Sequence, residues 1–139
     1  MYNPYTRYTE QSVMTMTNGE MLVRLYDETA KQMNAGLSHI ANNDVLATNT
    51  ALQKARTILN YLTQTLDFKY PISQNLSSLY EFFTRQIVLA NSHMDAQPIL
   101  DVIPMIEELR DTFAQSEKIV RMQQGARQPM TMGGLAMNG

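Results

Sequence analysis

The sequence predicts an all-α protein, an antiparallel up-down-up-down four-helix bundle. Four segments place apolar residues at spacings of three and four, which is the period of an amphipathic helix. These segments have similar lengths and short joining loops, and this favours antiparallel neighbours in a bundle. No stretch alternates apolar and polar residues as a strand does, and no repeat of solenoid length is present.

The first helix is predicted to begin at Thr17. The sequence TNGE is a capping box, in which the Thr17 hydroxyl and the Glu20 carboxylate satisfy two backbone N–H groups. The apolar face then runs to about Ala41 and consists of Leu22, Leu25, Tyr26, Met33, Leu37 and Ile40. The two asparagines that follow tolerate the left-handed conformation that ends a helix, and Asp44 can cap the next helix.

The second helix has the most regular pattern. Its apolar positions form a heptad seam of the kind found in helical bundles, namely Leu52, Ala55, Leu59, Leu62 and Leu66. Pro71 disfavours a helical residue before it, and Ser73 can cap the third helix, which is expected from about Gln74 to Met94. The fourth helix is expected to start near Asp101, because Pro104 then falls in the first turn, where backbone N–H groups have no partner.

The chain of 139 residues is expected to fold as one domain with two unstructured ends. We expect a flexible N-terminal arm over residues 1–16, the four-helix bundle over 17–121 and a disordered tail over 122–139. The chain lacks cysteine, a secretion-signal pattern at its start and an apolar run long enough to span a membrane. We therefore expect a cytoplasmic protein without membrane insertion.

The composition argues against catalysis, a cofactor and nucleic-acid binding. The two histidines, His39 and His93, lack the Glu-x-x-His pattern of a di-metal bundle, and no zinc, haem-attachment or phosphate-loop motif occurs. A haem held by His and Met is the one cofactor that the pattern does not formally exclude. The Lys and Arg residues are scattered and the formal net charge is −2, so no row of phosphates could be neutralised. We predict no enzyme, no catalytic residue, no metal and no cofactor.

The second and third helices carry more apolar residues than one packed seam needs. The seam of the third helix consists of Leu76, Leu79 or Tyr80, Phe83, Ile87 and Ala90. Ile58 and Tyr61 lie off the seam of the second helix, and Phe82 and Leu89 lie off that of the third. Two interpretations stay open: the residues flank a broad core-facing stripe, or they line a groove for an amphipathic partner helix. In a groove, each large side chain that is desolvated could contribute about 1.5–3 kcal/mol.

Short motifs follow one another along most of the chain. They are Asn3-Pro4-Tyr5 and Tyr8, Ser12-Val13, Thr15, Thr17, Glu20 and Leu25-Tyr26-Asp27, then Lys54-Ala55, Ile58-Leu59 and Thr65-Leu66-Asp67, then Asn75-Leu76, Leu79-Tyr80, Phe82, Arg85 and Ala90-Asn91, and finally Asp101-Val102, Arg110 and Phe113. In this order and spacing the sequence resembles the flagellar export chaperone family, FliS, over about residues 3–113. It departs from the family pattern at Asn18, at Lys69-Tyr70-Pro71 and at Pro104, all of which concern turns and helix starts.

The resemblance implies a bundle that binds newly made flagellin in the bacterial cytosol, prevents its premature polymerisation and delivers it to the flagellar export gate. The client in this family is the disordered C-terminal segment of flagellin, which becomes helical as it wraps the chaperone. The ordering of such a segment costs about 2–5 kcal/mol or more, which a long interface must offset. The alternative is a generic helical-bundle adaptor for another amphipathic client. The sequence does not indicate whether an anti-sigma factor or a co-chaperone is a second partner.

The resemblance also suggests which residues contact the client. The apolar contacts would be Ile58, Tyr61, Leu79, Phe82 and Leu89, and the polar contacts that set the register would be Arg85 and Gln86. Tyr5 and Tyr8, in the N-terminal arm, are the remaining candidates. Either the arm covers the groove until a client displaces it, or the two tyrosines pack on the bundle as part of its fold.

Overall fold

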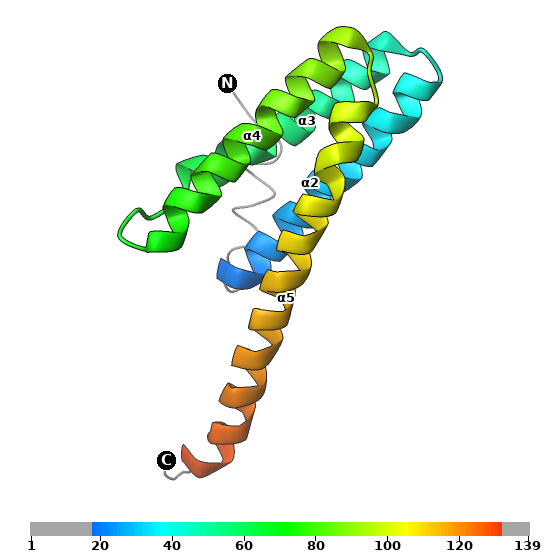
Figure 1. Ribbon diagram of the computed structural model, residues 1–139. Coiled ribbons are helices and arrows are strands. Elements are labelled where there is room, and N and C mark those ends of the chain that lie inside the picture. Colours follow the sequence, from blue (N-terminus) through cyan, green and yellow to red (C-terminus); the bar gives the residue numbers. More distant parts are fainter. Residues whose placement is uncertain (1–17, 132–139) are drawn as a thin grey trace.

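The protein is built from four helices (Figure 1). The computed structural model describes the backbone of residues 18–131 and the side chains of residues 19–123. The helices are α2 (Asn18–Ala41), α3 (Val45–Gln64), α4 (Pro71–His93) and α5 (Gln97–Thr131). Residues 18–131 contain no strand, so the predicted all-α class is confirmed.

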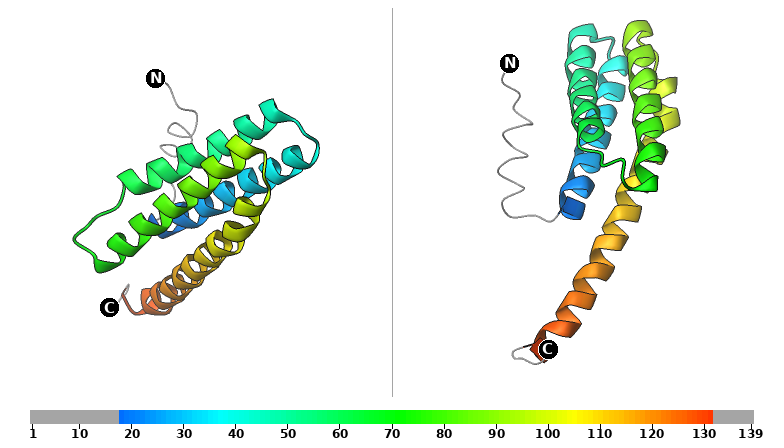
Figure 2. Two further views of the ribbon diagram at one scale, coloured as in Figure 1. Left: turned by 45° about the horizontal axis from the view of Figure 1, so that its top comes forward. Right: turned by 90° about the vertical axis from the view of Figure 1, so that its left-hand side faces the viewer.

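Successive helices run in opposite directions and form a closed ring (Figures 1 and 2). Helix α2 packs against both α3 and α5, and α4 packs against the same two helices from the other side. The order of directions and neighbours is that of an up-down-up-down bundle. This arrangement creates four surfaces between neighbouring helices, namely α2–α3, α3–α4, α4–α5 and α2–α5.

The core lies along the axis of this ring, and each helix contributes one apolar stripe. Its buried members are Leu25, Tyr26, Ala30 and Met33 from α2, Leu52, Ala55, Ile58, Leu59 and Leu62 from α3, Leu76, Tyr80, Phe83, Ile87 and Ala90 from α4, and Ile99, Val102, Ile103 and Ile106 from α5. The heptad seam predicted for α3 is therefore buried, and its last member, Leu66, packs against the core from beyond the helix end.

The start of α3 agrees with the sequence prediction. Asp44 caps this helix, because its Oδ1 accepts a hydrogen bond from the backbone N–H of Ala47 at 3.0 Å. Asn43 has φ of 56°, the left-handed conformation expected after α2. The predicted cap of α2, Thr17, lies outside the described residues.

Helices α4 and α5 start earlier than predicted. Helix α4 begins at Pro71, because a proline fits the first helical position, where no N–H is needed. Ser73, the predicted cap, lies inside the helix, and its hydroxyl donates to the carbonyl of Asp67 at 2.6 Å. Helix α5 begins at Gln97 rather than Asp101, and the Asp95 carboxylate accepts a hydrogen bond from the N–H of Gln97 at 3.0 Å.

The C-terminal end of α5 lies beyond the body of the bundle. The helix continues to Thr131, so its last turns fall within the tail that the sequence predicts to be disordered over residues 122–139 (Figure 1). The prediction rested on the missing apolar period after residue 121. However, the sequence MQQGARQ at 122–128 consists, apart from its glycine, of residues with high helix propensity. Such a sequence can extend an existing helix without an apolar face, because the costly nucleation step is already complete.

Candidate partner-binding surface

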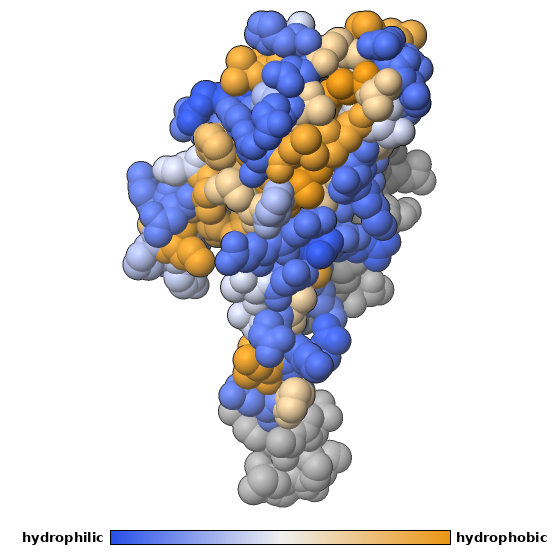
Figure 3. Space-filling view, turned by 45° about the vertical axis from the view of Figure 1, so that its right-hand side comes forward, coloured by the Kyte–Doolittle hydropathy of each residue, from blue (hydrophilic) through white to orange (hydrophobic). Residues whose placement is uncertain are grey.

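The groove between α4 and α5 is apolar. Leu79 of α4 and Met105 and Leu109 of α5 line a pocket of about 200 Å³ over the core residue Phe83. Phe82 follows Leu79 by three positions and Leu89 follows Phe82 by seven, so both lie on the same side of α4. The exposed fraction is 46% for Leu89 and 37% for Met105. Figure 3 shows apolar residues gathered in a band on the body of the bundle, with hydrophilic residues around it.

The groove between α3 and α4 is polar. It encloses about 730 Å³, and its lining residues are Gln53, Arg56, Thr57, Asn60 and Thr63 from α3 and Ser77, Tyr80, Glu81, Thr84 and Arg85 from α4. Arg85 pairs with Glu81 at 3.4 Å across one helical turn. The two helices are joined above this groove by a hydrogen bond of 2.9 Å, which the Asn91 amide donates to Asn49.

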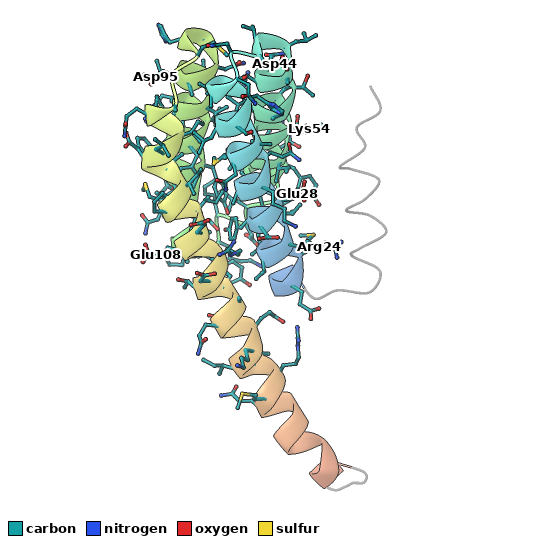
Figure 4. All side chains as sticks on the ribbon, turned by 90° about the vertical axis from the view of Figure 1, so that its right-hand side faces the viewer. Arg24, Glu28, Asp44, Lys54, Asp95 and Glu108 are labelled. Carbon is teal, nitrogen blue, oxygen red and sulfur yellow. The ribbon has the colours of Figure 1, made fainter. Side chains whose placement is uncertain are left out.

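The surface between α2 and α3 contains both polar and apolar residues. A pocket of about 400 Å³ lies there, with Gln32 and His39 on one wall and Ala47, Ala51 and Lys54 on the other. Figure 4 shows Glu28 and Lys54 on the side of the bundle where α2 and α3 meet. Tyr61 follows Lys54 by seven positions on α3, so it belongs to this α2–α3 side.

The surface between α2 and α5 carries ion pairs. Arg110 of α5 contacts Asp27 of α2 at 3.1 Å, and Asp27 also pairs with Lys31 at 3.3 Å. Hydrogen bonding to Asp111 is the main cause that raises the pKa of Arg110. Further along α5, Arg121 contacts Glu20. These pairs tie α5 to α2 and leave this edge polar.

A buried tyrosine pair lies at the base of the polar groove. The hydroxyls of Tyr26 on α2 and Tyr80 on α4 are 2.6 Å apart, and Phe113 of α5 packs on the Tyr26 ring at a centroid distance of 5.7 Å. Burial raises the pKa of both tyrosines above the ordinary value of 10.0. The pair therefore joins two helices that face each other across the ring and stays protonated at neutral pH. The sequence placed Tyr26 and Tyr80 on apolar stripes but carried no signal for this hydrogen bond.

The structure separates the residues that we expected in one groove. Leu79, Phe82, Gln86 and Leu89 lie on the α5 side of α4, whereas Tyr61 lies on the α2 side of α3. Arg85 is adjacent to Gln86 in sequence but points about 100° away, into the α3–α4 groove. Tyr5 and Tyr8 lie outside the described residues.

The structure corrects the expected role of Ile58, because Ile58 is a core residue. Its exposed fraction is 1%, and it packs with the buried leucines of α3, so it offers no surface to a partner in this structure. Its position beside the heptad seam made it look like part of a second stripe, but the buried face of α3 is wide enough to include it. The core-flanking interpretation is therefore correct for this residue.

The sequence also missed residues that line the two grooves of α4. Met105 and Leu109 complete the apolar groove, and their spacing of four was a usable signal. Arg56, which lines the polar groove, stood in the sequence as one of several scattered basic residues.

The described part of the chain has neither a metal-type cluster nor a membrane span. Within residues 19–123, no three His, Asp or Glu side chains gather as metal ligands would. None of the helices, over the residues that the structure describes, combines the length and apolar character that crossing a bilayer requires.

Comparison with known proteins identifies the family of the chain. Residues 1–120 match the family described as flagellar protein FliS. The flagellar secretion chaperone FliS of Bacillus subtilis (strain 168) is 32% identical over 114 residues, which cover 82% of this chain and 86% of that protein. The proteins of the same name from Salmonella typhimurium and Escherichia coli (strain K12) are 29% and 24% identical, over 76% and 77% of this chain and 81% of each relative. The chain therefore belongs to the FliS family of flagellar secretion chaperones.

Proposed function

We propose that this protein is a cytoplasmic export chaperone for flagellin. It binds the disordered C-terminal segment of flagellin, prevents premature polymerisation of flagellin and delivers flagellin to the flagellar export gate. The observation that carries the proposal is the apolar groove between α4 and α5, with Leu89 46% exposed at its rim, in a chain of the FliS family. An amphipathic client helix fits such a groove, because its apolar face replaces water on both partners.

The size of the groove indicates that one docking surface is not enough. The side chains that could contact a client there are Leu79, Phe82, Leu89, Met105 and Leu109. They are already partly buried, so further desolvation of each contributes roughly 1 kcal/mol, about half the value for a full burial. The sum of about 5 kcal/mol is comparable to the cost of ordering a disordered segment. A tight complex therefore needs a second surface.

The α2–α3 side is the second docking surface that we propose. Tyr61 is partly exposed there, beside the pocket that Ala47 and Ala51 line. A client that occupies both surfaces wraps around the bundle, since one surface involves α2 and α3 and the other α4 and α5. Ile58, beneath Tyr61, supports this surface from the core without contacting the client.

The N-terminal arm acts as a placeholder in this proposal. Tyr5 and Tyr8 are aromatic anchors that can cover an apolar groove until the client arrives. Deletion of residues 1–12 should then strengthen client binding and expose apolar surface to a hydrophobic dye. Weaker binding without newly exposed apolar surface would contradict the competition.

The function is tested by titration of the protein with a peptide that covers the C-terminal segment of flagellin from the same organism. We expect a 1:1 complex with a negative heat-capacity change in calorimetry, because apolar surface is buried. Circular dichroism should show a gain of helix on mixing. The proposal fails if the peptide does not bind, or if it binds without becoming helical.

A further inference from the structure

The polar α3–α4 groove lies between the two proposed docking surfaces. Around the ring, the α2–α3 side comes first, the α3–α4 groove second and the α4–α5 groove third. A client that wraps along this route from one docking surface to the other must cross the polar groove. The part of the client that crosses therefore meets Arg56, Asn60 and Arg85 rather than leucines.

Arg56 is the residue in this groove whose hydrogen bonding is incomplete. Its Nε is buried and has no hydrogen-bond partner. A guanidinium is always charged, and a buried donor without an acceptor costs free energy. A buried donor of this kind in a native protein calls for an explanation, and an acceptor supplied by a bound partner is one. A carboxylate fits, because it accepts two parallel hydrogen bonds from the Nε and Nη edge of an arginine.

The surrounding side chains favour an anion over a cation. The threonine hydroxyls of the groove already donate to their own helix, as Thr57 does to Gln53 at 3.0 Å and Thr84 to Tyr80 at 2.9 Å. Arg85 is matched by Glu81, which leaves Arg56 as the excess positive charge among the lining residues. Asn60 can donate a further hydrogen bond from its amide.

We propose that the α3–α4 groove binds an acidic side chain of the client, in the stretch that joins its two apolar segments, and that Arg56 is the contact. The inference rests on the proposed function. It predicts the pattern of the client: an apolar helix, a polar crossing with at least one Asp or Glu, and a second apolar helix. An apolar crossing is disfavoured, because it would cover the Arg56 guanidinium without supplying an acceptor.

The test compares Arg56→Gln with wild type in calorimetric titrations with the flagellin C-terminal peptide. We expect the affinity to fall about tenfold or more, which is the fold-change that one hydrogen bond to a charged group supplies. Arg56→Lys should restore only part of the loss, because lysine keeps the charge but lacks the planar fork. Lys31→Gln is the matched control, since it removes one positive charge from the α2–α5 edge and should leave the affinity within about twofold of wild type.

A second peptide identifies the client group that contacts Arg56. In this peptide, the Asp and Glu residues of the stretch that crosses the polar groove are replaced by Asn and Gln. Wild-type protein should bind it about tenfold more weakly, and Arg56→Gln should bind both peptides equally, because each change removes the same contact. An undiminished preference of Arg56→Gln for the acidic peptide would overturn the assignment. So would a client without any acidic residue between its apolar segments.

The stability of the free protein distinguishes a binding role from a structural one. Because the Arg56 Nε has no partner, Arg56→Gln should not lower the melting temperature of the free protein. A lower melting temperature with unchanged client affinity would show that Arg56 is structural and would refute the inference. If wild type binds neither peptide, the proposed function itself fails, and this result differs from a failure at Arg56 alone.

Discussion

The two grooves that α4 shares with its neighbours differ in chemistry although they belong to one helix. Towards α5, α4 presents Leu79, Phe82 and Leu89, which are only partly covered. Towards α3 it presents Ser77, Glu81 and Thr84, which line a wider pocket of about 730 Å³. The change occurs within about 100° of rotation about the helix axis, the angle between consecutive residues.

Under the proposed function, this difference separates two tasks in client binding. Apolar contacts in the α4–α5 groove supply free energy but are not directional, so they fix the position of a client helix poorly. Polar contacts in the α3–α4 groove add less net free energy but demand matched partners, and this sets register and selects the sequence. Substitutions in the two grooves should therefore have effects of different size and kind.

The largest effect is expected from Leu89→Asp in the apolar groove. Leu89 is 46% exposed, so the free protein should stay folded, but a bound client would cover an unpaired carboxylate there. We expect the client affinity to fall by about 2 kcal/mol or more, roughly 30-fold, in calorimetric titrations.

The matched control uses an uncharged substitution, Val88→Asn compared with Leu89→Asn, because Val88 follows Thr84 by four positions and an added acid there would face the polar groove that the client's acidic side chain is proposed to enter. Val88 is 39% exposed and precedes Leu89, but it points about 100° away from the apolar groove. Val88→Asn should therefore reduce the client affinity by only a few-fold, and by less than Leu89→Asn. Equal losses of client affinity at both positions would mean that the client does not distinguish the two sides of α4. The two grooves would then not differ in their contribution to binding.

The next effect concerns the buried tyrosine pair beneath the polar groove. Tyr80→Phe should lower the free energy of unfolding by about 1–3 kcal/mol, because it leaves the Tyr26 hydroxyl buried without a partner. Replacement of both tyrosines by phenylalanine should cost less than the single change, since no polar group is then stranded. Urea denaturation of Tyr26→Phe, Tyr80→Phe and the double variant measures this non-additivity. A double variant that is less stable than both single variants would contradict it.

The same pair predicts a loss of stability at alkaline pH. Burial raises the pKa of Tyr26 and Tyr80 in the folded protein, so the unfolded chain releases these protons first. Stability is therefore unaffected below the ordinary value of 10.0 and falls as the pH rises above it. About half a pH unit above that value the loss should be about 1–2 kcal/mol for the pair. In denaturation experiments at this pH, the double phenylalanine variant should lose less stability than wild type.

The sequence predicted the bundle well because its core pattern is local. The seam of Leu52, Ala55, Leu59 and Leu62 and the cap at Asp44 are decided by residues within one helix, and they are as predicted. The site was predicted less well because a groove depends on which sides of two helices meet. Periodicity placed Ile58 and Tyr61 together. In the structure, Ile58 is buried in the core, whereas Tyr61, three positions later, is partly exposed.

The polar groove shows why some of the site lay beyond the sequence. Arg56 differs from the other scattered basic residues because its Nε is buried without a partner, and burial of a single atom depends on the packing of α3 against α4. The Tyr26 and Tyr80 hydroxyls are 54 positions apart in the chain and meet only across the closed ring. No spacing rule within one helix predicts either feature.

The smallest effect is expected at the rim of the polar groove. Asn91→Ala removes the exposed hydrogen bond to Asn49 and should lower the free energy of unfolding by about 0.5–1 kcal/mol, since water can replace it. Because the bond joins α3 to α4 above the groove, hydrogen exchange should become faster at this end of the two helices, while the amides beside Tyr80 keep their protection. Faster exchange throughout α3 and α4 would show instead that this one bond holds the groove walls together, and that the polar groove is less rigid than the apolar one.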